Sequence, residues 1–234
     1  LENNSASKLD SANIIYLIEY PTVNSSEDFY DKLVNKLLNK NTPFFFLFSS
    51  EVDVKKLGRL NNLLPFSIQR VEKNYLQVQP DLQINELNNP LLQNSTINEW
   101  NNLPPISQPI SAITVKPESK IISKIRINNQ PRNNALIVSR NLGSKRSVGV
   151  IAKDIWRWKL QTANKNLSLF DNFIISSSRW LNAPDDQKKV KIKTSKKFYS
   201  SGEVIEFSAQ VYDESFNPVN DAEVKININS KYSK

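Results

Sequence analysis

The sequence predicts an α/β domain with a mostly parallel sheet, followed by a partial all-β, sandwich-like module. Three observations support this prediction. Residues 13–48 contain a strand-like run, a helical pattern and a second strand-like run, a succession typical of a βαβ unit with parallel strands. Residues 147–152 form an apolar run without alternation, as expected of a strand covered on both faces. Residues 190–228 carry three short strand-like runs separated by turn residues.

The predicted βαβ unit can be followed residue by residue. Residues 13–20 are mainly apolar and stop at Pro21, which indicates a buried strand. Serines and acidic residues at 25–28 form a helix N-terminus, after which apolar residues recur every three or four positions as far as Leu38. Residues 44–48 are continuously apolar and predict the second strand.

The middle of the chain is less regular. We expect a short helix over residues 52–64, ended by Pro65, and then irregular structure with a few antiparallel strands as far as residue 131. Residues 135–140 and 147–152 predict two strands joined by a short turn. A helix over residues 167–181 closes the predicted domain.

The charge of the chain is unevenly distributed. The 234 residues carry a net charge of +8, with 31 Lys and Arg against 23 Asp and Glu. Most of the basic excess falls in residues 111–200, which suggests either a surface for anionic polymers and membranes or an ordinary solvated face. Aromatic and basic residues are interleaved only at 156–158, so we expect no nucleic-acid partner.

Two residue types are missing altogether. The chain contains no Cys and no His, which excludes cysteine nucleophiles, Ser-His-Asp triads and zinc sites with Cys or His ligands. We therefore predict neither a cofactor nor a metal. No apolar run reaches 18 residues, as a membrane-spanning helix requires. Met is also absent, even at position 1, which we interpret as a sign that the chain is a segment of a longer protein.

A family resemblance rests on the order of several short segments. They are the strand ending near Pro21, the strand at 44–48, and the motifs at 60–65, 89–92, 100–105 and 156–158. In this order they resemble the class I glutamine amidotransferase-like domain of large bacterial membrane-anchored proteins. Residues 199–204 and 217–222 resemble the immunoglobulin-like or macroglobulin-like module that can follow such a domain.

The resemblance implies a flavodoxin-like three-layer α/β/α domain over residues 1–184 and an incomplete immunoglobulin-like module over 185–234. The first strand of a complete domain would lie before Leu1. It also implies an extracytoplasmic, periplasmic location in a membrane-anchored protein, with protein partners or other domains of the same chain. Active members use Cys with His and Glu, so the resemblance implies a degenerate, non-catalytic domain here.

Candidate site residues follow the two N-terminal strands. Ser49 and Ser50 come directly after the strand at 44–48, where open α/β sheets bind ligands. They are either a nucleophile or ligand contacts, or the N-cap of the next helix. Glu19 ends the first strand and is either a buried acid or the polar residue at which the strand leaves the core.

A second group of candidates follows the strand at 147–152. Asp154 occupies the position of a helix N-cap. Together with Trp156, Arg157 and Trp158 it predicts an exposed aromatic platform for a glycan or peptide. The alternative is packing, with Trp156 in the core and the other two residues tying the strand end to the linker.

The lysines at 188–197 alternate with apolar residues. This pattern suits either binding to anionic headgroups or an edge strand protected from aggregation. An incomplete β module leaves a strand edge exposed, through which a homodimer could form.

Three functions remain in view. The one we favour is a non-catalytic interaction or scaffolding segment of a larger bacterial envelope protein. The alternatives are a hydrolase or transferase that uses Ser or carboxylate groups completed by other parts of the protein, and a binder of anionic polymer or membrane surfaces through the basic middle segment.

Overall fold

The computed structural model divides the chain into two units, Leu1–Asp185 and Asp186–Lys234, and each is described here by itself. The structure describes residues 6–82, 86, 89–142, 145–163, 169–183, 190–196, 198–200, 202–212, 219 and 221–227. Most of the predicted linker at 182–189 lies outside the described residues.

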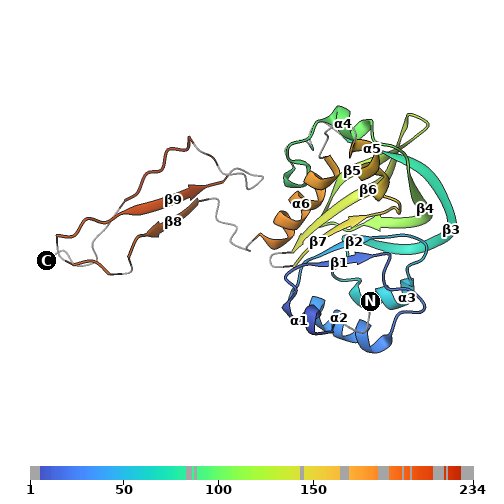
Figure 1. The fold of residues 1–234 in the computed structure, drawn as a ribbon, viewed down its shortest axis with the longest axis horizontal. Coiled ribbons are helices and arrows are strands. Elements are labelled where there is room, and N and C mark those ends of the chain that lie inside the picture. Colours follow the sequence, from blue (N-terminus) through green and yellow to red (C-terminus); the bar gives the residue numbers. More distant parts are fainter. Residues whose placement is uncertain are drawn as a thin grey trace. The chain divides into compact units, whose positions relative to one another are not determined.

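The first unit is organised around one sheet of seven strands in the order β1-β2-β7-β6-β5-β3-β4. Only β1, β2 and β7 are parallel to one another, and every other pairing is antiparallel (Figure 1). The strands are β1 (Ile15–Ile18), β2 (Phe44–Leu47), β3 (Phe66–Asp81), β4 (Ile106–Val115), β5 (Ser119–Ile127), β6 (Gln130–Leu142) and β7 (Lys145–Val150).

The predicted flavodoxin-like fold with a mostly parallel sheet is therefore wrong. Residues 65–131, predicted to be largely irregular, contain β3, β4 and β5. Most side chains in the middle of β3 are exposed or half-buried, so this long strand lacks the apolar alternation that marks a strand in a sequence. β5, β6 and β7 are joined by short turns and pair antiparallel, and β3 pairs antiparallel with β4 and β5 across longer connections. These pairings give the sheet its mixed character.

The predicted βαβ unit is confirmed. β1 and β2 pair in parallel, with Ile15 opposite Phe44. Helix α2 (Glu27–Asn39) connects them, and the Ser26 hydroxyl caps it by accepting a hydrogen bond from the Phe29 backbone N–H at 3.4 Å.

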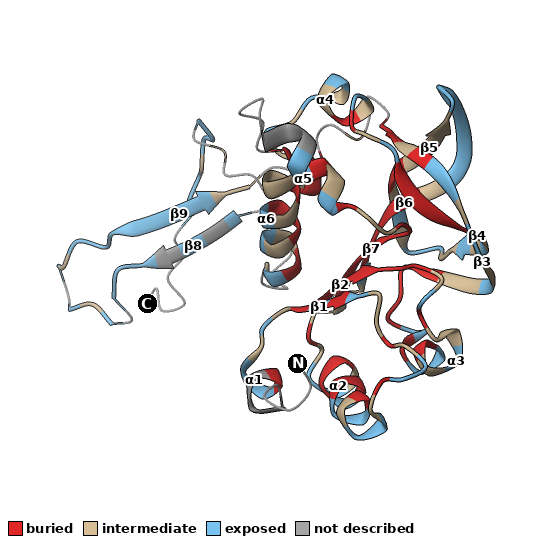
Figure 2. Ribbon diagram, turned by 45° about the vertical axis from the view of Figure 1, so that its right-hand side comes forward, coloured by how far each residue is buried: buried red, intermediate tan, exposed pale blue. Residues whose placement is uncertain are grey.

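Helices cover both faces of the sheet. Figure 2 shows α1 (Ala6–Ser11), α2 and α3 (Val54–Leu57) on one side and α5 (Trp156–Ala163) and α6 (Leu169–Asn182) on the other. The short elements η2 (Gly58–Leu60), η4 (Pro90–Leu92) and α4 (Ile97–Asn101) complete the unit. Two buried apolar clusters result, one on each face.

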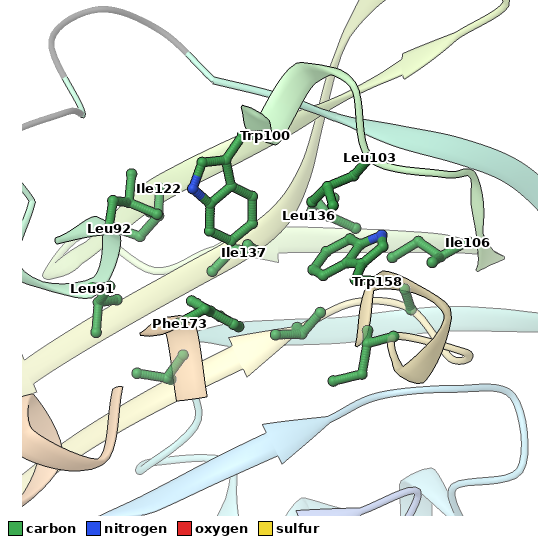
Figure 3. Close-up of a cluster of buried hydrophobic side chains, with 14 of the residues drawn as sticks. Leu91, Leu92, Trp100, Leu103, Ile106, Ile122, Leu136, Ile137, Trp158 and Phe173 are labelled. Carbon is green, nitrogen blue, oxygen red and sulfur yellow. The ribbon is translucent and has the colours of Figure 1, made fainter. Parts of the chain in front are cut away.

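The cluster beneath α5 and α6 is centred on aromatic rings. Trp100 lies edge-on to Trp158 and to Phe173, with ring centroids 5.8 Å and 5.4 Å apart (Figure 3). All three side chains are almost completely buried. Edge-to-face pairs of this kind stabilise a core beyond the area that they bury.

The start of β3 is fixed by residues of the central strands. Arg140 Nη1 donates hydrogen bonds to the carbonyl oxygens of Asn62 and Leu64, at 2.6 Å and 3.0 Å. The Ser147 hydroxyl donates to the carbonyl oxygen of Leu63, which lies between them, at 2.8 Å. Three consecutive carbonyl groups, those of exposed Asn62 and of buried Leu63 and Leu64, are thus satisfied by side chains of β6 and β7.

Gly149 in β7 makes room for this segment. A Cβ atom at that position would lie 2.6 Å from Phe66 Cε1 and 2.9 Å from Pro65 Cγ. Phe66 is fully buried against Phe46 and Phe48, so its ring has no free space into which it could withdraw.

The second unit contains two antiparallel strands, β8 (Val190–Thr194) and β9 (Phe207–Val211). Both lie within strand-like runs of the sequence. The third predicted strand, at 222–228, is wrong over residues 222–227, and residue 228 lies outside the described residues.

We expect Gly149→Ala to lower the free energy of unfolding by about 2 kcal/mol, because the new methyl group overlaps Phe66 and Pro65. Chemical denaturation of the purified protein measures this change. Gly58→Ala is the matched control, since Gly58 has helical backbone angles and open space around its Cα. It should leave stability unchanged or raise it by about 0.5 kcal/mol. Equal effects of the two substitutions would contradict the close approach at Gly149.

Candidate functional site

The parallel strands β1, β2 and β7 end at one edge of the sheet, and polar residues follow each of them. We call Glu19, Ser49, Ser50, Lys153 and Asp154 the strand-end cluster. The antiparallel pair formed by β3 and β4, here called the β3–β4 ribbon, contacts this cluster through its own polar side chains.

Glu19 and Ser49 contact each other directly. The Ser49 hydroxyl donates a hydrogen bond to Glu19 Oε2 at 2.9 Å and accepts one from the Glu51 backbone N–H at 3.2 Å. Ser49 is fully buried, whereas Glu19 is half-buried. Glu19 has a φ of 49°, in the left-handed region that few residues other than Gly adopt. The N-cap of α3 is Asp53 rather than either serine.

Ser50 is held by the ribbon instead. Its backbone N–H donates to Tyr75 Oη at 3.1 Å, and the two hydroxyl oxygens lie 2.6 Å apart. Lys153 lies above the same ring, with Nζ 3.9 Å from the ring centroid. Tyr75 of β3 therefore joins the end of β2 to the end of β7.

Asp154 has a φ of 66° and is also bound by the ribbon. Its Oδ2 accepts a hydrogen bond from the Ser107 hydroxyl at 3.0 Å, and Ser107 in turn accepts one from Gln77 Nε2 at 3.1 Å. Arg157 Nη2 lies 3.7 Å from the same carboxylate oxygen. The Asp154 carboxylate is thus directed at Ser107 of β4 and at Arg157, while α5 begins two residues further on, at Trp156.

The predicted aromatic platform is divided between surface and core. The Trp156 side chain is 54% exposed, and the Arg157 guanidinium lies 5.8 Å from its ring centroid. Trp158 is only 1% exposed, and its indole N–H donates to the Pro104 carbonyl oxygen at 3.2 Å. The packing alternative put Trp156 in the core, whereas the structure buries Trp158 and exposes Trp156.

An open groove of about 460 Å³ lies beside Trp156. It is lined by Gln77, Pro104, Pro105, Trp156, Arg157 and Leu160. A second cavity, of about 510 Å³, lies between β4 and β6. Neither is lined by Glu19, Ser49 or Ser50. The two serines are brought to one edge of the sheet with Glu19, but not to either of these cavities.

Two partners of the cluster, Tyr75 and Ser107, escaped the sequence analysis, as did Gln77, which donates a hydrogen bond to Ser107. They belong to the ribbon, whose strands were predicted only as short runs, so nothing indicated that it contacts the strand ends. Within the described part of the chain there is no group of three or more acidic, His or Cys side chains that could hold a metal ion.

No protein-family model matches the chain, and no curated protein matches it. Among solved structures, a cytoplasmic protein from Salmonella typhimurium gives a TM-score of 0.47 at 9% identity, covering 75% of this chain and 74% of that protein. A second cytoplasmic protein, from Salmonella typhimurium LT2, gives a TM-score of 0.47 at 8% identity, with 74% of each chain covered.

The cold-adapted beta-galactosidase from Rahnella sp. R3 gives a TM-score of 0.44 at 11% identity. This match covers 86% of the present chain but only 27% of the enzyme. Likenesses at these identities and TM-scores carry no argument about function.

Two predictions that came with the family resemblance can be compared with these matches. The extracytoplasmic location finds no support in the comparisons, in which the two Salmonella proteins are described as cytoplasmic, and we withdraw it. Among the described helices none is long and apolar enough to cross a membrane. The resemblance to glutamine amidotransferase-like domains is not addressed by the matches and stays a prediction.

We expect Tyr75→Phe to lower the free energy of unfolding by about 1 kcal/mol, because the Ser50 N–H loses its acceptor while the ring beneath Lys153 remains. Combining it with Ser50→Ala in a double-mutant cycle measures the coupling between the two hydroxyl groups, which should be about 0.5 kcal/mol or more. Additive effects would show that the hydroxyl groups of Ser50 and Tyr75 do not interact.

The two tryptophans of α5 should differ sharply in their contribution to stability. Trp158→Ala should lower the free energy of unfolding by about 4 kcal/mol, because it leaves a large cavity beside Trp100. Trp156→Ala should change it by less than about 0.5 kcal/mol. Thermal and urea denaturation of both variants make the comparison, and similar losses would refute the assignment of Trp156 to the surface.

Proposed function

We propose that the chain is a non-catalytic interaction module. The observation that carries this proposal is that side chains of the strand-end cluster bond to one another or to the β3–β4 ribbon. Ser49 is buried against Glu19, Ser50 is bonded to Tyr75, and Asp154 accepts a hydrogen bond from Ser107.

A serine nucleophile needs a base that removes its proton and a free path for the substrate. Ser49 has a carboxylate within hydrogen-bond distance but is fully buried, so a substrate cannot reach its hydroxyl. Ser50 is bonded to a Tyr hydroxyl, which is a poor base near neutral pH. The chain has no His or Cys to take either role. These contacts support an architectural role for the cluster.

The basic middle segment gives less support to the anionic-polymer alternative. Arg140 and Arg146 are almost fully buried and donate to backbone carbonyl groups of Leu64 and Trp180. Lys159 and Lys120 form ion pairs with acidic side chains. The positive charge of Arg140 and Arg146 therefore serves the fold and is not offered to a polymer.

The proposal is tested by assaying the purified protein for hydrolysis of glutamine and of p-nitrophenyl acetate. We expect no turnover above that of Ser50→Ala, with Ser208→Ala in exposed β9 as the matched control. Turnover that is lost in Ser50→Ala and retained in Ser208→Ala would overturn the proposal and favour the hydrolase alternative.

A further inference from the structure

The cavity of about 510 Å³ between β4 and β6 is lined in an unusual way. Residues 111–115 of β4 and 133–135 of β6 all contribute to it, without a gap in either stretch. Successive side chains of a strand point to opposite faces, so a cavity bounded by consecutive residues runs along the backbone edge of a strand. We call this cavity the β4–β6 groove.

The two edges that bound the groove have no strand partner among the described residues. β4 is the last strand of the sheet and pairs on one side with β3. β6 pairs with β7 only from Ile137 to Leu142, while its first residues pair with β5 alone. Each edge therefore presents backbone N–H and C=O groups that an additional strand could pair with.

One end of the groove is already closed by hydrogen bonds that cross it. The buried Gln108 side chain donates from Nε2 to the carbonyl oxygens of Ala135 and Ile151, both at 3.0 Å. Next to it the Lys153 backbone N–H donates to the Ser107 carbonyl oxygen at 2.8 Å. The two sides thus meet at this end and are separate along residues 111–115, where the cavity lies.

The side chains that line the groove indicate what kind of molecule it can bind. Ile113, Val115, Ile121 and Ile151 supply apolar surface, while serine, threonine and asparagine side chains supply polar groups. No charged side chain lines the groove among the described residues. Nucleic acids and anionic lipid surfaces are bound by clustered positive charge, which this lining lacks.

We propose that the β4–β6 groove binds an uncharged, extended segment of another protein, which pairs with the free edges of β4 and β6 as an added strand. Main-chain hydrogen bonds provide affinity in this mode, and alternate side chains provide specificity. The bound segment has apolar residues at alternate positions, facing the isoleucines and Val115. This inference rests on the proposed interaction function and names the surface and the chemistry of the partner.

The register of β5 and β6 offers a selective variant. Lys124 pairs with Ala135 and Ile125 with Arg132, so Asn133 and Asn134 form a bulge without ladder partners in β5, although Asn133 Oδ1 accepts a hydrogen bond from Lys124 Nζ at 3.1 Å. Asn134→Pro removes a backbone N–H beside the groove and leaves the β5–β6 pairs in place. Asn74→Pro is the matched control, because Asn74 is an exposed residue in the irregular part of β3 and does not line the groove.

The probe is a fluorescein-labelled peptide of about eight residues in which Val and Thr alternate, a length typical of a strand. Fluorescence anisotropy should show saturable binding to the full chain and to Asn74→Pro. Binding to Asn134→Pro should be about ten-fold weaker, since a main-chain hydrogen bond is lost. The same peptide with N-methyl groups on alternate amides should not bind the unaltered protein, a result that needs no variant to fold.

The inference is overturned if the peptide does not bind, or if neither Asn134→Pro nor N-methylation weakens binding. Circular dichroism shows whether Asn134→Pro is folded, and the N-methylated peptide decides the question if it is not. Sedimentation velocity shows whether the unaltered protein is a dimer. If it is, and if Asn134→Pro is a monomer, the groove binds a second copy of this chain and the proposal of another protein is overturned. The two proposals fail in different ways. Cleavage of the peptide, detected by mass spectrometry, refutes the non-catalytic function, whereas absence of binding in the anisotropy measurement refutes only the binding site in the groove.

Discussion

The close contact of Phe66 with Gly149 is the constraint on which the rest of the first unit depends. The absent side chain lets the ring lie against the central strand, and Arg140 and Ser147 bind the three carbonyl groups just before it. The chain therefore leaves the sheet at one defined point. From there β3 passes close to the ends of the parallel strands, where an open α/β sheet would expose its ligand site.

The course of the ribbon explains why polar residues in a promising position do not form an open site. Tyr75 contacts Ser50, and the Ser107 hydroxyl donates to the carboxylate of Asp154, whose backbone is left-handed. Glu19, the other left-handed residue, accepts a hydrogen bond from Ser49 within the cluster. The surface that we propose for recognition lies elsewhere, at the free edge of β4, the last strand of the sheet.

Local patterns in the sequence were sufficient for the elements that bury an apolar face. The helix after Ser26, the strand at Phe44 and the parallel pairing of β1 and β2 follow from such patterns. β3 was not predictable in this way, because most of its side chains are exposed or half-buried and its pairing depends on residues about forty positions away. The packing alternative placed Trp156 in the core, whereas the structure buries Trp158 instead. Positions close together in a helix differ only in their rotation about the helix axis, so the sequence did not indicate which tryptophan faces inward.

The pairing of β2 with β7 also determines the order in which the sheet can assemble. Phe44 lies opposite Ser147, so about a hundred residues must be synthesised before β2 acquires its inner neighbour. Until then the run Phe44–Leu47 presents an aromatic strand edge to the surroundings of the nascent chain. Pairing between residues so far apart in the sequence slows folding, and it leaves this aromatic strand edge open to aggregation until β7 has been made.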